Sequence, residues 1–315
     1  DGIEADGFRL LVQSLHKAGY SLAIIAPSSN HSATGMRINL MTPMALRSRS
    51  DLVAQWGLKP ETTPVHLFEL DGTPCDTMIV ALDGGLDHLI PGVRPQLVVS
   101  GVNLGPNLSQ DSYHSGTMGA AREAGLYGVP AIATSFTSFD PAGMDASIRA
   151  TLEAVERACS ILPLVAENMG RPNGRMDTGY FSAWPQPLND ERWLDDAEGA
   201  LRSAFTNGDL MLNLNIPPTW DGEWETTRLG VRWYRNAGRL DTAEGEDTAT
   251  FTIGAASVDH TPVTLGDCDA VEVDKASISC LSVWPQSHPF ALDEDLLAHG
   301  LEQTTNGWPN WLHQG

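Results

Sequence analysis

Apolar residues in the first half of the chain follow helical and strand spacing in turn. Positions 8–15 carry them at the intervals of one helix face, and this pattern ends before Gly19. The apolar run that follows, Ser21–Ala26, is typical of a buried strand. Later runs predict helices over Asp76–Leu86, Thr117–Leu126 and Ala142–Asn168, and strands over Gln96–Val99 and Ala131–Ser135. This alternation indicates a parallel sheet with right-handed crossovers.

The second half of the chain has a different pattern. Residues Gly170–Gly208 are largely polar and contain several prolines, which indicates an insertion. Beyond it, we expect strands over Leu210–Ile216, Arg228–Tyr234, Thr250–Ala255 and Ser277–Val283, and a closing helix over Leu292–Gln303. The pattern favours antiparallel pairing of these later strands.

Composition and charge narrow the possible partners. The chain has 315 residues, enough for one large α/β domain or two smaller ones, and a formal net charge of −21. Such a charge repels polyanions and argues against binding of nucleic-acid polymers. No apolar run spans a bilayer and the first residues lack a secretory pattern, so we expect no membrane partner. The four cysteines form no CxxC pair, which argues against a metal–thiolate site and favours a cytoplasmic location.

The segment Ser100–Glu123 combines a strand end, a polar glycine-containing loop and a helix start. A helix start offers unpaired backbone N–H groups and a partial positive charge, so it favours bound anions such as phosphate. The polar candidates in this segment are Asn103, Asn107, Ser115 and Thr117, and close backbone approach is possible at Gly101, Gly105 and Gly116. Helix capping uses the same N–H groups, so capping and phosphate binding both stay open.

Three polar segments are expected at one edge of the sheet, because ligands of doubly wound sheets bind beyond the carboxyl ends of the strands. They are residues 27–35, the loop from Gly101, and Asp1–Ile3 before the first helix. One carboxylate, one hydroxyl-bearing loop and one Asn-rich loop could converge on a hard cation. Oxygen ligands of this kind suit Mg²⁺ or Mn²⁺ rather than zinc.

Seven short motifs stand in separate parts of the chain. They lie at Asp1–Ile3, Ala26–Ser32, Gly72–Asp76, Ser100–Asn107, Ser115–Glu123, Leu212–Pro217 and Asp267–Val271. In this order they resemble the SurE (survival protein E) nucleotidase family, over about residues 1–285. Each motif alone is weak, but seven in order are specific. The resemblance implies an α/β fold, a Rossmann-like parallel-core three-layer sandwich with a C-terminal β-hairpin and helix extension.

The resemblance also implies an activity and a metal site. Members of the family hydrolyse nucleoside 5′- and 3′-monophosphates with a divalent metal, which is held by two adjacent aspartates, a loop serine and a loop asparagine. By motif, Asp1 corresponds to the second aspartate, Ser32 to the serine and Asn103 to the asparagine. The family's first aspartate and its strand would lie upstream of residue 1.

On this basis we expect a Mg²⁺ or Mn²⁺ ion at Asp1, Ser32 and Asn103. The phosphate of a small phosphomonoester would be held by Asn107, Ser115, Gly116 and Thr117. Four residues are expected to act in catalysis, namely Asp1, Asn107, Ser115 and Thr117.

The expected organisation has three parts. Residues 1–168 form the catalytic core, 169–209 an acidic insertion, and 210–315 the remaining strands, an oligomerisation extension and the terminal helix. The resemblance implies a homodimer or homotetramer with exchanged C-terminal elements. Two rival functions differ in class. A dinucleotide-dependent oxidoreductase would need a GxGxxG fingerprint that the sequence lacks, and a non-catalytic nucleotide-binding or assembly homologue would fit the missing first aspartate.

Several other polar residues near these motifs are expected to have no catalytic role. His31 and His114 are interpreted as loop histidines without a function in the reaction. Cys75 is expected to be buried packing rather than a nucleophile. Asp267 and Asp269 form a D-x-D pair that is interpreted as structural, because loop acids in so acidic a chain are usually solvated.

Overall fold

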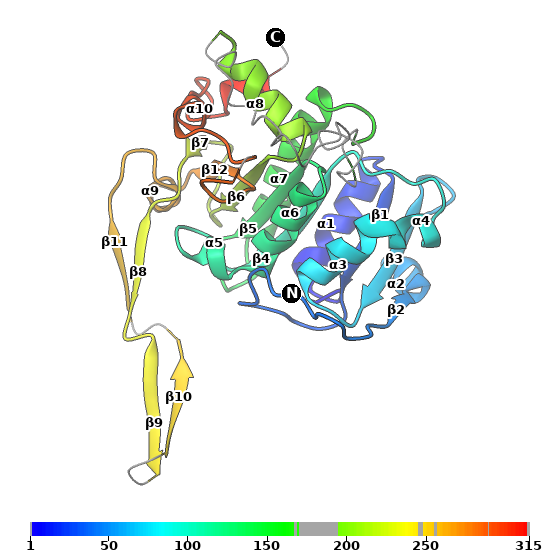
Figure 1. The fold of residues 1–315 in the computed structure, drawn as a ribbon, viewed down its shortest axis with the longest axis horizontal. Helices are drawn as coiled ribbons and strands as arrows, with labels where there is room; N and C mark the ends of the chain where they lie inside the picture. Colours follow the sequence, from blue (N-terminus) through cyan, green and yellow to red (C-terminus); the bar gives the residue numbers. More distant parts are fainter. Residues whose placement is uncertain are drawn as a thin grey trace, which may run out of the picture.

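The computed structural model describes residues 2–166, 169, 195–244, 248–254, 257–288 and 290–313. It confirms the expected α/β class, with a core of largely parallel strands between helices (Figure 1). Asp1 and residues 170–194 lie outside the described residues, so most of the expected insertion does too.

The first sheet is built from early apolar runs. β1 (Leu22–Pro27) and β3 (Val65–Leu70) pair in parallel, and the short β2 (Leu46–Ser48) pairs antiparallel with β3. α1 (Asp6–Lys17) precedes β1, and α2 (Ser50–Gln55) leads from β2 toward β3. The spatial order β1–β3–β2 leaves β2 at an edge.

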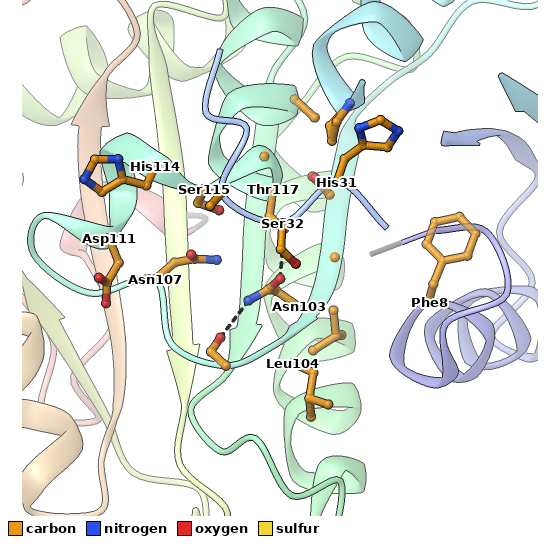
Figure 2. Close-up of a pocket in the computed structure, with 18 of the residues that line it drawn as sticks. Phe8, His31, Ser32, Asn103, Leu104, Asn107, Asp111, His114, Ser115 and Thr117 are labelled. Carbon is orange, nitrogen blue, oxygen red and sulfur yellow. Dashed lines mark hydrogen bonds between the residues drawn. The ribbon is translucent and has the colours of Figure 1, made fainter. Parts of the chain in front are cut away.

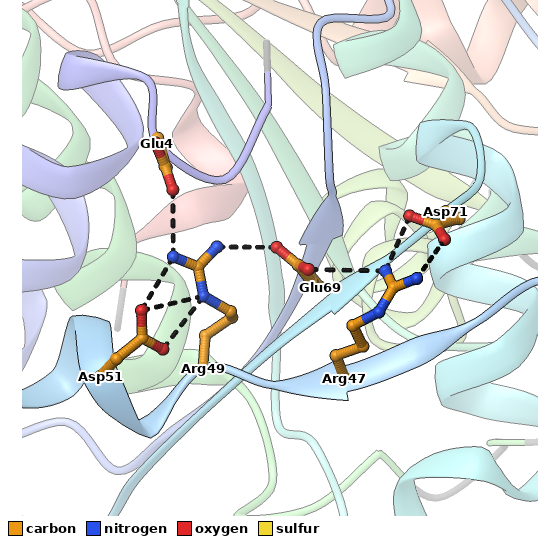
Figure 3. Close-up of polar contacts among 6 residues, drawn as sticks. All are labelled: Glu4, Arg47, Arg49, Asp51, Glu69 and Asp71. Carbon is orange, nitrogen blue, oxygen red and sulfur yellow. Dashed lines mark hydrogen bonds and ion pairs between the residues drawn. The ribbon is translucent and has the colours of Figure 1, made fainter.

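Charged side chains cover this edge (Figure 3). Arg49 binds the carboxylates of Glu4, Asp51 and Glu69 at 3.0, 2.9 and 2.7 Å. Arg49 directly follows β2, and Arg47, on β2, contacts Glu69 at 3.5 Å. Charges on an edge strand discourage pairing with another chain. The contact with Glu4 also holds the segment before α1 against this sheet.

The second sheet has five strands and carries the most buried part of the core. In spatial order they are β4 (Val98–Leu104), β5 (Ala131–Phe136), β6 (Leu210–Ile216), β12 (Ala276–Ser282) and β7 (Trp224–Thr227). β4, β5 and β6 are parallel, whereas β12 runs antiparallel to β6 and parallel to β7.

Alternation along β5 divides the core into two helix layers. Ile132 packs in a cluster with α1 and α7 (Met144–Ile161). Its neighbour Ala131 points to the other face and packs with α6 (Gly116–Leu126), against which α3 (Pro74–Val80) also lies. Opposite faces of one strand therefore contact different helices, which gives the expected three layers.

The two sheets face each other across an apolar cavity of about 590 Å³ between β1 and β4. Leu22 and Ile24 line it from β1, Val98 from β4, and Leu11 from α1. In the described part of the chain, β1 and β4 therefore each have one strand edge without a hydrogen-bonded neighbour. The parallel strands of the described core thus lie in two sheets.

Two hairpin-like ribbons form an arm that extends away from the body (Figure 1). β8 (Val231–Arg235) pairs antiparallel with β11 (Ser257–Thr261), and β9 (Gly238–Glu244) with β10 (Thr248–Ile253). The arm exposes the apolar side chains of Val231, Trp233, Leu240, Phe251, Ile253 and Val258.

The last part of the chain packs near β6. α8 (Ala197–Thr206), which falls in the range expected to be an insertion, lies on β6 and contacts both α10 (Glu294–His299) and η3 (Asn310–Leu312). The rings of Phe205 and Trp311 are 5.5 Å apart between their centroids. α9 (Asp267–Glu272) precedes β12, and in the described ranges no helix has the length and apolar character to cross a bilayer.

Three expected helices have different limits in the structure. The helix expected over Ala142–Asn168 ends at Ile161, because Pro163 disfavours helical continuation at and before its own position. The helix expected over Asp76–Leu86 begins at Pro74 and breaks at Gly84, where φ is 100°. The turn around it, η1 (Ala81–Gly85), leads into α4 (Leu86–Leu89). The closing helix is shorter than expected, since α10 covers only six residues.

The strand prediction was incomplete. It did not include β2, β3, β7, β9 and β11. It also ended the strand over Gln96–Val99 too early, because β4 continues to Leu104. Asn103 therefore stands on the end of a strand rather than in a free loop.

Candidate active site

The loop that carries Ser32 follows β1 and is fixed by its own side chains. The Ser32 backbone N–H and hydroxyl both donate to Asn30 Oδ1, each at 2.8 Å. Gly35 N donates to His114 O at 2.7 Å, which ties the end of the loop to the segment before α6. Hydrogen bonds within the turn and to His114 thus bring Ser32 toward the loop between β4 and α6.

The first described residues lie beside the same loop. Ile3 N donates to Pro27 O at 2.8 Å. Gly2 approaches Ser29 so closely that a Cβ would lie 2.8 Å from the Ser29 carbonyl carbon. Asp1, the expected carboxylate ligand, lies outside the described residues, but its neighbour in sequence is placed next to the loop of Ser32.

Asn103 is oriented by a hydrogen bond near the end of β4. Its Nδ2 donates to Gly105 O at 2.8 Å, and its Oδ1 accepts a long hydrogen bond of 3.5 Å from Thr117 Oγ1 (Figure 2). The amide nitrogen is therefore used within the loop, and the oxygen faces the start of α6. An amide oxygen in this position is a suitable donor for a hard cation.

The start of α6 supplies the anion-binding geometry. Ser115 caps the helix, since its Oγ accepts from Met118 N at 3.2 Å. At Gly116 a Cβ would lie 2.9 Å from Pro74 Cγ and 3.0 Å from Thr34 Oγ1, so glycine permits close packing of the loops. The N–H groups of the first turn and the Thr117 hydroxyl lie at the same cavity.

Asn107 is held by two asparagines of β6. Asn107 N donates to Asn215 Oδ1 at 2.8 Å, and its carbonyl accepts from Asn213 Nδ2 at 3.0 Å. The Asn107 side chain donates to Ser135 Oγ at 2.7 Å. The sequence singled out the Leu212–Pro217 motif without a role for its asparagines. The structure places them beneath the loop as its supports.

One cavity of about 550 Å³ unites these groups. Its lining includes every expected site residue that the structure describes, namely Ser32, Asn103, Asn107, Ser115, Gly116 and Thr117. Phe8, Leu104 and Phe139 add apolar surface, and His31 and His114 also reach the cavity (Figure 2). The placement brings the expected residues together, and their roles stay predictions.

Three residues of this cavity were not expected from the sequence. Asp111 comes from α5 (Asp111–His114), and Arg232 and Tyr234 come from β8. Burial raises the pKa of the Asp111 carboxyl above its ordinary value. Arg232 Nη1 lies 3.7 Å from Asp111 Oδ2. The alternation of residues in the expected strand Arg228–Tyr234 is the one signal in the sequence that pairs Arg232 with Tyr234 on a face.

Two of the residues that were expected to have no catalytic role, Cys75 and Asp267, are buried. Cys75 is fully buried, and burial raises the pKa of its thiol to about 12, so the thiol stays protonated at neutral pH. Asp267 is also fully buried, contrary to the expectation that it is solvated. Its carboxylate accepts from Ser109 N at 3.0 Å and from Gly230 N at 2.8 Å. These hydrogen bonds offset the desolvation cost of the buried carboxylate, which is consistent with a structural role for Asp267.

The donor set fits a hard cation. In the described ranges, no group of three or more His, Cys, Asp or Glu side chains could hold a metal. The available donors in the described residues are instead the Ser32 hydroxyl and the Asn103 amide oxygen, which line one cavity. Neutral oxygen donors with one carboxylate suit Mg²⁺ or Mn²⁺, which retain several waters.

Comparisons with known proteins agree with this architecture. A family profile described as "Survival protein SurE" matches residues 1–236. A protein of Carboxydothermus hydrogenoformans named 5′-nucleotidase SurE is 31% identical over 284 residues, which cover 84% of this chain and 87% of that protein. A protein of the same name from Prochlorococcus marinus strain MIT 9515 is 31% identical over 251 residues, or 78% of this chain and 72% of that protein.

A solved structure shares the fold. The SurE protein from Aquifex aeolicus superposes with a TM-score of 0.61 at 22% identity, over 91% of this chain and 92% of that chain. Together, the family profile, the relatives and the shared architecture show that this chain belongs to the SurE family.

Proposed function

We propose that this chain is a metal-dependent phosphomonoesterase that hydrolyses nucleoside 5′-monophosphates, and also 3′-monophosphates, to nucleoside and phosphate. The observation that carries the proposal is the convergence of Ser32, Asn103 and the start of α6 on one cavity. Relatives named 5′-nucleotidase SurE support the substrate class.

The metal belongs at the expected donors Asp1, Ser32 and Asn103. When bound, a Mg²⁺ or Mn²⁺ ion supplies positive charge that offsets the charge of the transferring phosphoryl group and acidifies water. Asn103 contributes a neutral oxygen that Gly105 O orients by accepting from its Nδ2. The carboxylate of Asp1 is the expected group to orient the attacking water.

The phosphate belongs at the first turn of α6. Backbone N–H groups at Gly116 and Thr117 donate to phosphate oxygens in this proposal, and the helix N-terminus favours the anion. The Thr117 hydroxyl, which donates to Asn103 Oδ1 over 3.5 Å in the structure, turns to a phosphate oxygen in this proposal. Ser115 Oγ accepts from Met118 N, so its own proton is left for the phosphate. Asn107 adds its amide, and Asn213 and Asn215 keep its backbone in place. This is preorganisation of donors for developing charge.

Phosphate release from AMP, GMP and p-nitrophenyl phosphate tests the proposal. We expect release with Mn²⁺ or Mg²⁺ that EDTA abolishes and added metal restores. Asn103→Ala should reduce kcat/KM by roughly a hundredfold or more, the typical loss for removal of one preorganised group. A rate that persists in EDTA would refute the metal dependence. A protein that is inactive with each metal would refute hydrolysis and favour the non-catalytic homologue instead.

The proposal extends to assembly and location. The exposed fractions of Trp233, Phe251 and Ile253 on the arm are 56%, 58% and 81%. A two-stranded ribbon by itself is only marginally stable in water. A homodimer or homotetramer that covers the arm explains both features. Four cysteines without disulfides fit a cytoplasmic location.

Light scattering during size-exclusion chromatography tests the assembly. Replacement of residues 238–254 by a short Gly-Ser turn should lower the mass of the particle to that of a smaller assembly. A particle with the same number of chains before and after the replacement would exclude the outer arm from the interface.

A further inference from the structure

The base of the arm forms a wall of the active-site cavity. On β8 the side chains alternate, so Arg232 and Tyr234 lie on the face toward the cavity and Trp233 and Arg235 on the opposite face. The Arg232 side chain is 23% exposed, whereas that of Arg235 is 57% exposed and bonds Asp259 at 2.6 Å. Two arginines on one strand thus have different surroundings.

Buried hydrogen bonds fix this wall to the loop that carries Asn107. Ser109 Oγ accepts from Arg232 N at 3.1 Å, and Ser109 N donates to the buried carboxylate of Asp267 at 3.0 Å. The other oxygen of Asp267 accepts from Gly230 N at 2.8 Å, just before β8. The arm base and the loop are therefore held as one unit, and the wall is in place before a ligand binds.

The side chains of this wall combine charge, hydrogen-bonding groups and an aromatic ring. Arg232 lies 3.7 Å from Asp111 Oδ2, and its guanidinium stands 5.7 Å from the centroid of the Tyr234 ring. The Tyr234 hydroxyl interacts with the same carboxylate. In the described part of the chain, Asp111 Oδ2 is buried without a hydrogen-bond donor. The Asp111 side chain as a whole is 15% exposed and lines the cavity, so a ligand in the cavity can contact it.

We propose that Asp111, Arg232 and Tyr234 form the subsite for the nucleoside part of the substrate, with a sugar hydroxyl donating to Asp111. The aromatic ring of Tyr234, with Val258 of the paired strand β11, offers apolar surface to the base. This inference rests on the proposed function and adds the residues that select the leaving group.

The local charge favours a neutral leaving group over a second phosphate. The opposite charges of Asp111 and Arg232 nearly cancel, and the carboxylate at the cavity wall repels an additional anion. The cavity volume of about 550 Å³ lies in the range of small-molecule sites, and Asn107 and Ser115 separate Asp111 from Asn103 in Figure 2. Phosphate and nucleoside can therefore occupy different ends of one cavity.

The test compares kcat/KM for AMP with kcat/KM for p-nitrophenyl phosphate, which has no sugar. In Arg232→Ala and Asp111→Asn, we expect the ratio of the two values to fall by about tenfold or more, since a site loses discrimination when its polar contacts to one substrate are removed. Arg235→Ala is the matched control on the same strand and should leave the ratio unchanged. An unchanged ratio in both variants, or an equal fall in Arg235→Ala, would overturn the subsite.

Two further measurements separate the subsite from the proposed function. Calorimetry with adenosine needs neither metal nor hydrolysis, and its Kd should rise about fivefold or more in Arg232→Ala and Asp111→Asn. Absence of adenosine binding to the wild type at millimolar concentration would overturn the subsite, even if phosphate release is normal. A wild type that binds adenosine and releases no phosphate would instead refute only the proposed function. A larger loss with adenosine 3′,5′-bisphosphate than with AMP would assign Arg232 to a second phosphate and overturn the inference.

Discussion

Asn103 and Asn107 have the same side chain, but different hydrogen bonds orient their amides differently. Both are asparagines of the same motif, and the sequence offers no way to tell how each amide is oriented. Asn103 Nδ2 donates to Gly105 O, so the Asn103 Oδ1 points toward Thr117. Asn107 Nδ2 donates instead to Ser135 Oγ on β5. The Asn103 amide therefore presents its oxygen to the cavity, whereas the Asn107 amide uses one of its two N–H groups to hold the loop.

Glu123 is a buried carboxylate that should make stability depend on pH. It is 8% exposed, and burial first, then the charge of Asp76, raises its pKa above the ordinary value. Its neutral form is therefore favoured in the folded state. Its contribution to stability is full below the ordinary pKa of a glutamate and is lost as pH rises through the elevated pKa.

Glu123→Gln should remove this dependence. We expect the free energy of unfolding at pH 7 to rise by on the order of 1 kcal/mol, since a desolvated charge is replaced by a neutral amide. Urea unfolding between pH 4.5 and 7.5 measures it, with the exposed Glu61→Gln as control. If Glu123→Gln is less stable than the wild type at pH 7, the carboxylate is stabilised by its surroundings and the account of this residue is wrong.

At the scale of elements, α1 is positioned by a glycine. Gly7 lies so close to β4 that a Cβ would stand 2.6 Å from Val102 O and 3.3 Å from Met144 Sδ. α1 thereby lies against β4, the strand that carries Asn103. The helix cannot carry a larger side chain here without moving away from the sheet.

Gly7→Ala should therefore destabilise the fold in spite of the better helix propensity of alanine. We expect a loss of about 1–3 kcal/mol in the free energy of unfolding, the usual cost of overpacking. Chemical denaturation measures the loss, and Lys17→Ala, at an exposed position of the same helix, is the control. Stability equal to or above that of the wild type would show that α1 and β4 are not in close contact.

The elements that the sequence predicted well are the ones whose local signal is strong. β6 is a continuous apolar run interrupted by two asparagines, and it has the predicted bounds. β2 and β9 are short or polar, so they follow from pairing rather than from their own residues. Pro163 explains the end of α7 at Ile161, although the apolar spacing continues past it.

At the scale of the molecule, contacts between distant segments determine the cavity. Ser32, Asn103 and Thr117 could be expected to meet, because each follows a strand or begins a helix at the same edge of the core. Arg232 could not, since it lies more than a hundred residues from Asp111, and hydrogen bonds of Ser109 and of the buried Asp267 carboxylate hold the two segments together. Residues of both the expected core range 1–168 and the expected C-terminal range 210–315 thus line one cavity.

The central claim is that oxygen donors of separate loops gather a divalent cation beside the phosphate site. Anomalous diffraction from crystals of the protein soaked with Mn²⁺ and inorganic phosphate locates that cation directly. The account predicts one manganese peak in contact with Asn103 Oδ1 and Ser32 Oγ, with phosphate against the first turn of α6, and loss of the peak in Asn103→Ala. A manganese peak elsewhere in the molecule, or an equally strong peak in Asn103→Ala crystals, would contradict it.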